Sequence, residues 1–168
     1  MKRENIYFAK VKEGAIIPSK RDEDAGMDIY ACFDEECLII KPHETKLIPT
    51  GIASVCSDDY VFILRERGSN GSKGIAQRCG VIDSGYRGQW FVPLTNTNDK
   101  PIIIAKESFR NKLLIELNDL YIIYPYEKGI AQALLVPVPK VNINEISYDE
   151  LQEFKSERGT GALGSSGK

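Results

Sequence analysis

One loop of this sequence concentrates hydrogen-bond donors. The segment RERGSNGSKG (residues 65–74) holds two arginines, one lysine, three glycines and two serines. Glycines let backbone N–H groups turn inward, and arginine and serine add side-chain donors, so such a loop suits a phosphate group. It lacks the Walker-loop pattern. The segment predicts a phosphate site, with an ordinary polar hairpin loop as the alternative.

Two aspartates interrupt apolar sequence. Asp83 ends the apolar run in GVIDSGYRG (80–88) and enters a turn, from which its carboxylate could activate a water as general base. Asp28 lies within AGMDIYA (25–31), and a semi-buried carboxylate must be paired or must orient the water shell of a metal, because lone burial is costly. The alternatives are an Asx-turn at Asp83 and a structural pair with an arginine at Asp28.

The C-terminal segment repeats the phosphate pattern. Residues 156–168 (SERGTGALGSSGK) combine Arg158 with four glycines and the serines Ser165 and Ser166. A flexible arm of this composition can close over a polyphosphate, and it loses its conformational freedom only when the ligand binds. The alternative is a disordered terminus without function.

Histidine and cysteine exclude several kinds of site. The single histidine, His43, rules out a multi-His metal site, and we expect it in a solvated turn. No two cysteines have the C-x-x-C spacing, so Cys32, Cys37, Cys56 and Cys79 are expected to act as small hydrophobic residues. Chemistry must therefore come from carboxylates, Arg, Lys, hydroxyls and the backbone.

Length and charge narrow the class of protein. The 168 residues predict one domain, and the formal net charge of -2 argues against a nucleic-acid-coating surface. No apolar run approaches the roughly 18 residues of a membrane span, and the first ten residues lack the apolar core of a signal peptide. We expect a soluble cytoplasmic protein with no nucleic-acid or membrane partner.

Short strands dominate the pattern that must position these residues. Segments rich in β-branched and aromatic residues, separated by turn signals, are found at 6–11, 27–33, 37–40, 46–56, 60–66, 90–95, 101–105, 121–124 and 130–138. This number of short strands predicts an all-β protein, a jelly-roll-like barrel or sandwich. No βαβ alternation is visible, which disfavours a Rossmann-like sheet.

Two segments depart from the strand pattern. Phe109, Leu113, Leu117 and Leu120 have near-helical spacing and predict a helix inserted at 106–121. Near the C-terminus, SYDELQEF (147–154) begins with the serine and glutamate of a capping box. We expect that second helix to bury its leucine and phenylalanine, Leu151 and Phe154.

The domain organisation follows from these elements. We expect one β domain over residues 1–155, interrupted by the helical insert, and a flexible Gly/Ser-rich arm over residues 156–168. No internal repeat is found.

Taken together and in order, these motifs resemble the trimeric dUTPase family. The resemblance runs over residues 25–167 and rests on AGMDIYA, the Arg-Gly-Ser loop with its lysine, GVIDSGYRG, GIAQ (129–132) and RGTGALGSSG. The insert resembles versions from Gram-positive bacteria and their phages. The resemblance implies a jelly roll, a homotrimer with active sites shared between subunits, and Mg²⁺-dependent hydrolysis of dUTP to dUMP and pyrophosphate.

The resemblance also implies roles for individual residues. Asp83 would be the general base that orients water toward the α-phosphate, and Tyr86 would pack under the deoxyribose and exclude a 2′-hydroxyl. Asp28 would act on Mg²⁺ through water, because the triphosphate chiefly holds the metal.

The other implied contacts form three groups. A turn would read uracil largely through backbone groups at Gln77, Gly80, Val81 and Ile82. Phosphates would be held by Arg67 and Ser69, with Gly68 between them, and by Gln132. The arm of one subunit would close the site of another, with Leu163 over the base and a β/γ-phosphate clamp of Arg158, Gly164, Ser165 and Ser166.

Two alternatives remain open. A dCTP-deaminase-related enzyme would carry a Ser-Ser-x-Ala-Arg loop with a catalytic glutamate, which this sequence lacks. A dUTPase-fold regulatory protein would capture a protein partner, and the charged face of the insert at 106–121 is the candidate surface.

Overall fold

The structure, a computed structural model of the chain, describes residues 4–78, 80–116 and 120–161. It forms two compact units, Met1–Val138 and Pro139–Lys168. The functional division that we expect, at residues 155 and 156, stays a prediction. Among the described residues, no helix combines the length and apolar character that crossing a membrane requires.

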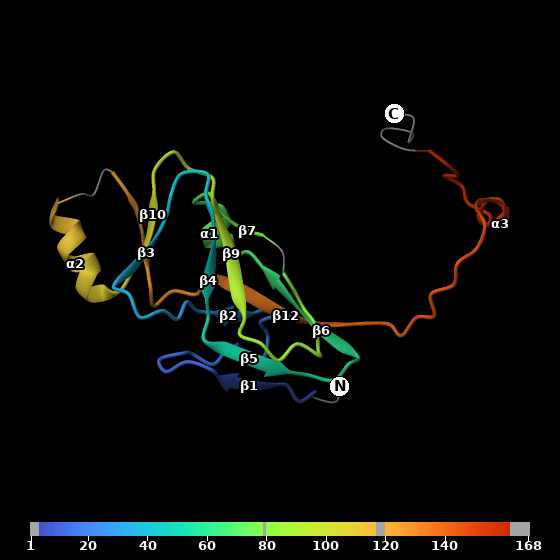
Figure 1. Cartoon of the computed structure of the whole chain (residues 1–168), viewed down its shortest axis with the longest axis horizontal. Coiled ribbons are helices and arrows are strands. Elements are labelled where there is room, and N and C mark those ends of the chain that lie inside the picture. Colours follow the sequence, from blue (N-terminus) through green and yellow to red (C-terminus); the bar gives the residue numbers. More distant parts are fainter. Residues whose placement is uncertain (1–3, 79, 117–119, 162–168) are drawn as a thin grey trace. The chain divides into compact units, whose positions relative to one another are not determined.

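The first unit is built mainly from short strands, which confirms the all-β prediction (Figure 1). Every predicted strand segment contains at least one strand. The strands are β1 (Tyr7–Lys10), β2 (Met27–Ile29), β3 (Cys37–Ile40), β4 (Thr45–Pro49), β5 (Ile52–Val55), β6 (Tyr60–Arg65), β7 (Ile75–Gln77), β8 (Val81–Ile82), β9 (Phe91–Asn96), β10 (Ile102–Ala105), β11 (Ile122–Pro125) and β12 (Ala131–Pro137).

The segment expected as one strand at 46–56 is two. Gly51 separates β4 from β5 with a φ of 68°, in the left-handed region that favours glycine. A Cβ at Gly51 would lie 2.9 Å from both Ala15 Cβ and Cys32 Sγ. The chain therefore turns here between two sheets.

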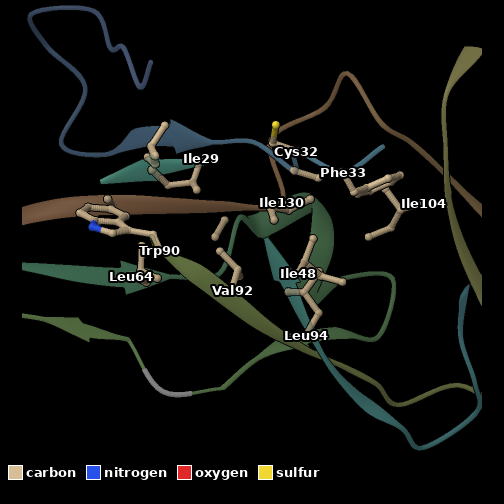
Figure 2. Close-up of a cluster of buried hydrophobic side chains, with 14 of the residues drawn as sticks. Ile29, Cys32, Phe33, Ile48, Leu64, Trp90, Val92, Leu94, Ile104 and Ile130 are labelled. Atoms are coloured by element: carbon tan, nitrogen blue, oxygen red, sulfur yellow. The ribbon is translucent and has the colours of Figure 1, made fainter. Parts of the chain in front are cut away.

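The strands form four small sheets that share one apolar core. Their orders are β2-β12-β6-β8, β4-β9-β7, β11-β10-β3 and β1-β5. Figure 2 shows labelled side chains from several of these sheets within one buried cluster. Within this core, the fully buried rings of Phe62 and Trp90 meet nearly edge to face, with centroids 5.1 Å apart. Such a pair contributes about 0.5–1.5 kcal/mol beyond its buried area.

The insert forms the crossover between two parallel strands, which the sequence did not predict. Strands β10 and β11 pair in parallel, and α2 (Glu107–Glu116) lies in their connection. This confirms a helix within 106–121; the expected apolar positions from Leu113 to Leu117 lie outside the described side chains. An ion pair of 2.9 Å from Arg110 to Glu127 ties α2 to the chain after β11.

The second unit contains the capped helix α3 (Tyr148–Glu153). Ser147 is its N-cap, and Ser147 and Glu150 form the predicted capping box. The expected burial of Leu151 and Phe154 is wrong, because these side chains are 51% and 69% exposed. A helix of six residues needs an opposing element to cover its apolar face, and the described part of this unit supplies none.

The predictions for the histidine and for the three described cysteines are confirmed. His43 lies exposed in a turn, and its Nε2 is 3.0 Å from Asp99 Oδ1. Cys32 and Cys56 are buried, and Cys37 is partly buried; all three are free. Cys79 lies outside the described residues.

Candidate functional site

Sheet register brings two separate motifs side by side. On β12, Gln132 pairs with Asp28 of β2 on one side and with Arg65 of β6 on the other. Directly opposed residues on antiparallel strands have Cβ atoms about 4.5–5.5 Å apart. The AGMDIYA and GIAQ segments therefore contribute neighbouring side chains to one place.

Asp28 is paired with Arg67 through one hydrogen bond and a second ion-pair contact. Arg67 Nε lies 3.0 Å from Asp28 Oδ1, and Nη2 donates to Oδ2 at 3.2 Å. Another hydrogen bond, of 2.9 Å, runs from Nη1 to the Gly129 carbonyl. The structural pair that the sequence left open at Asp28 is therefore present. A guanidinium has five N–H donors, so one on Nη1 and one on Nη2 remain for a ligand.

These residues line a cleft with a volume of about 570 Å³. The cleft contains Asp28 and the four phosphate residues predicted outside the arm, Arg67, Gly68, Ser69 and Gln132. Sequence reasoning missed its other wall, which is formed by Ser19, Lys20, Glu23, Asp24, Ala25 and Gly26. The charged run KRDED directly before AGMDIYA was the available signal.

A short helix holds the predicted phosphate loop in place. Helix α1 (Gly68–Gly71) begins after Arg67, whose carbonyl accepts a bond of 2.8 Å from the Asn70 amide. The Asn70 side chain is buried, and its Nδ2 donates to the Ile130 carbonyl at 2.9 Å. The loop is thereby tied to the segment that leads into β12.

The predicted uracil turn is divided between two sheets. β7 pairs with β9, whereas β8 pairs with β6. Gln77, on β7, lines a second cavity of about 390 Å³ that shares Arg67 and Gly68 with the cleft. Its backbone N–H donates to Glu66 Oε1 at 3.0 Å.

Gly80 enables the close approach of β8 to β6. Its carbonyl accepts a 2.7 Å bond from the Leu64 amide, and a Cβ at this position would lie 2.6 Å from the Leu64 carbonyl oxygen. The backbone of the predicted uracil-reading turn is therefore held directly against β6. Val81 and Ile82 follow as β8 itself.

Asp83 and Tyr86 lie in the turn after β8. The Tyr86 amide donates to the Asp83 carbonyl at 3.0 Å, and the Tyr86 hydroxyl donates to the Gln89 carbonyl at 3.0 Å. Tyr86 is 44% exposed, so it is not a core aromatic, whereas Trp90 is one. The Asp83 carboxylate is exposed and has no hydrogen-bond donor within the described part of the chain.

Asp83 lies far from the cleft of its own chain. Ile82 pairs with Phe62, and Gln132 pairs with Arg65 across the opposite edge of β6. At about 3.3 Å per residue, Asp83 lies roughly 13 Å from Arg65 along that strand. The structure thus brings together the phosphate residues predicted outside the arm, but it does not bring Asp83 or Tyr86 to them.

The predicted arm residues belong to the second unit. Arg158 Nε donates to the Gly161 carbonyl at 2.9 Å. Leu163, Gly164, Ser165 and Ser166 lie outside the described residues. No cluster of three or more potential metal ligands occurs within the described ranges.

The fold and site define a β protein with a polar cleft in which Lys20 and Arg67 lie among three carboxylates. The dUTPase family model matches residues 12–116. The chain is 39% identical to the deoxyuridine 5′-triphosphate nucleotidohydrolase of Psychromonas ingrahamii, over 86% of this chain and 82% of the relative. It is 34% identical to the enzyme of that name from Nautilia profundicola, over 97% and 99%. The chain therefore belongs to the dUTPase family.

The fold agrees with this family. The dUTPase of Staphylococcus bacteriophage 80alpha, solved as a mutant with dUpNHpp, superposes with a TM-score of 0.75 at 21% identity, covering 98% of this chain and 99% of that one. The native EIAV dUTPase superposes with a TM-score of 0.62 at 20% identity, covering 86% of this chain and 98% of that one. These likenesses confirm the predicted jelly-roll fold.

Proposed function

We propose that this protein hydrolyses dUTP to dUMP and pyrophosphate. The observation that carries the proposal is the convergence of Asp28, Arg67, Ser69 and Gln132 on one cleft in a member of the dUTPase family. The order of the motifs along the chain matters less than this convergence, because phosphate binding requires several donors at one place.

The cleft would hold the triphosphate by charge and hydrogen bonding. Arg67 retains two N–H donors after its bonds to Asp28 and Gly129, and a guanidinium binds phosphate oxygens well. The Ser69 hydroxyl and the Gln132 amide add neutral donors. Donors fixed before the reaction stabilise the charge that develops on the departing pyrophosphate.

Asp83 would act as general base. Its exposed carboxylate would accept a proton from water while the water oxygen bonds to the α-phosphorus. The bond from that phosphorus to the α,β-bridging oxygen breaks, and pyrophosphate leaves with the bonding electrons. Tyr86 would pack under the deoxyribose, and backbone groups near Gly80 would recognise uracil.

We further propose a homotrimer with shared sites. The roughly 13 Å separation of Asp83 from the cleft along β6 supports this arrangement, because a base in one subunit can reach the cleft of another. The apolar side chains of Val81 and Phe91, 64% and 42% exposed, are suited to burial between subunits. Arg158 and the residues after it would close the site as an arm.

Mg²⁺ would bind chiefly through the triphosphate, and it would neutralise phosphate charge. Both Asp28 oxygens already lie against the Arg67 guanidinium, so this carboxylate is suited to contact a metal-bound water rather than the metal. A phage phi11 dUTPase mutant, similar in fold, coordinates a structural Mg(II) ion. We also propose a cytoplasmic location, which the free cysteines Cys32, Cys37 and Cys56 favour.

The first test is pyrophosphate release from dUTP, UTP, dTTP and dCTP with Mg²⁺. We expect selective turnover of dUTP and a decrease of about 10²–10⁴-fold in Asp83→Asn. Asp99→Asn is the matched control, because the Asp99 carboxylate is also exposed but contacts the imidazole ring of His43. Absence of turnover of every nucleotide would overturn the proposal and favour a regulatory protein; release of ammonia from dCTP would favour a deaminase.

A further inference from the structure

A chain of buried hydrogen bonds connects the core to Arg67 of the phosphate cleft. Tyr124 on β11 is 4% exposed, and its hydroxyl lies 2.5 Å from the Gly129 carbonyl oxygen and 2.9 Å from Asn70 Oδ1. Burial raises the pKa of Tyr124, which keeps the hydroxyl protonated. Its single proton is therefore shared between two buried acceptors.

The Gly129 carbonyl is the point where this chain meets the cleft. Its oxygen accepts from Arg67 Nη1 at 2.9 Å as well as from Tyr124. A carbonyl oxygen has two lone pairs, so both are used. The Gly129 peptide is thus held by a donor on the cleft side and a donor on the core side.

Asn70 fixes the other end of the chain. This side chain is 2% exposed, and its Nδ2 donates to the Ile130 carbonyl at 2.9 Å, which sets the orientation of the amide. Oδ1 then faces the Tyr124 hydroxyl. Because Asn70 belongs to α1, the amide ties the loop that begins at Arg67 to the same segment that carries Gly129.

Little free space is left around these groups. A Cβ at Gly129 would lie 3.1 Å from Asp28 Cγ and 3.4 Å from Arg67 Nε. The peptide therefore packs directly against the Asp28–Arg67 pair. A shift of this peptide would turn the guanidinium and redirect its two remaining N–H donors.

We propose that Tyr124 and Asn70 are positioning residues for Arg67: they hold the Gly129 peptide, and through it they aim the guanidinium at the phosphates of the ligand. The inference rests on the proposed function, since it assigns Arg67 to phosphate binding. Neither residue touches the ligand. Both act through the backbone between β11 and β12.

The test is the Tyr124→Phe variant, which keeps the ring and removes the hydroxyl. We expect the Kd for α,β-imido-dUTP to rise about fivefold, the scale of one lost hydrogen bond, while the Kd for deoxyuridine stays unchanged. Tyr126→Phe is the matched control, because Tyr126 also follows α2 but packs against Phe33. An equal change for both ligands, or the same change in Tyr126→Phe, would overturn the inference.

A double-mutant cycle separates positioning from a general loss of stability. In an Arg67→Ala background, Tyr124→Phe should cause no further loss of affinity, because the group it aims is gone. Additive losses would assign Tyr124 a purely structural role. Asn70→Ala should show the same coupling to Arg67, and it carries the test if Tyr124→Phe does not fold.

The proposed function and this inference can fail separately. Inorganic tripolyphosphate, which has no base or sugar, serves as a second probe in the same cycle. A wild-type protein that does not turn over dUTP but whose tripolyphosphate affinity shows the coupling would refute only the proposed function. Turnover of dUTP without coupling would refute only the positioning role.

Discussion

At the scale of single residues, three glycines let backbone segments approach functional groups. A Cβ would lie 2.8 Å from Gln132 Oε1 at Gly26, 2.6 Å from the Leu64 carbonyl oxygen at Gly80, and 3.1 Å from Asp28 Cγ at Gly129. None of the three has a positive φ, so space rather than backbone conformation requires glycine here. The motifs around the site therefore require glycine where any side chain would collide, in addition to the functional side chains that they carry.

Gly80→Ala tests this requirement at the tightest of the three positions. The new methyl group would push β8 away from the Leu64 carbonyl, which is backbone and has little freedom to move. We expect overpacking to lower stability by about 1–3 kcal/mol, and Tm by about 2–12 °C in thermal unfolding. Gly85→Ala is the control, because a Cβ there meets nothing within 4 Å. Equal Tm values for the two variants would contradict the steric account.

At the scale of elements, local pattern predicted the strands but not their pairing. The alternation and turn signals located every long strand, yet β7 and β8 have only three and two residues, too few for a period to be visible. The motif order identified Asp28, Arg67 and Gln132 together. The Asp28–Gln132 contact itself depends on register between β2 and β12, a long-range property that no local window contains. The same reason hid the Tyr124 network.

The insert is an element whose removal tests the parallel pairing. Deleting residues 106–121 would join Ala105 directly to Ile122, although these residues lie at opposite ends of β10 and β11. A parallel pair requires a crossover, so β11 would leave the sheet. We expect Tm to fall by about 10 °C or more, with loss of activity.

The control for the insert is Asn111→Ala, on the exposed surface of α2, which keeps the crossover and should keep Tm and turnover. A deletion variant with wild-type Tm and turnover would show that the insert is an independent surface module, as a partner-capturing segment would be. The sequence alone suggested that simpler role, because the parallel partner of β10 was not visible in it.

At the scale of the whole molecule, one chain does not assemble the proposed catalytic set. The cleft holds Arg67 and Gln132, whereas the proposed base, Asp83, lies roughly 13 Å from Arg65 along β6. A hydrolase with this distribution works only if subunits exchange these parts. The proposed homotrimer supplies that exchange by symmetry, because every copy offers the same base and the same cleft.

Mixed trimers therefore provide a decisive measurement. Asp83→Asn and Arg67→Ala chains are each expected to be inactive, and each should sediment near three times 18.8 kDa. After the two are unfolded together and refolded at equal ratio, a site that takes its base from one subunit and its cleft from another is intact in about a quarter of cases, which predicts about a quarter of wild-type pyrophosphate release. Sites contained within single chains would recover nothing, since every chain lacks one part. Recovery in an assembly other than a trimer would exclude the homotrimer while still showing that the sites are shared.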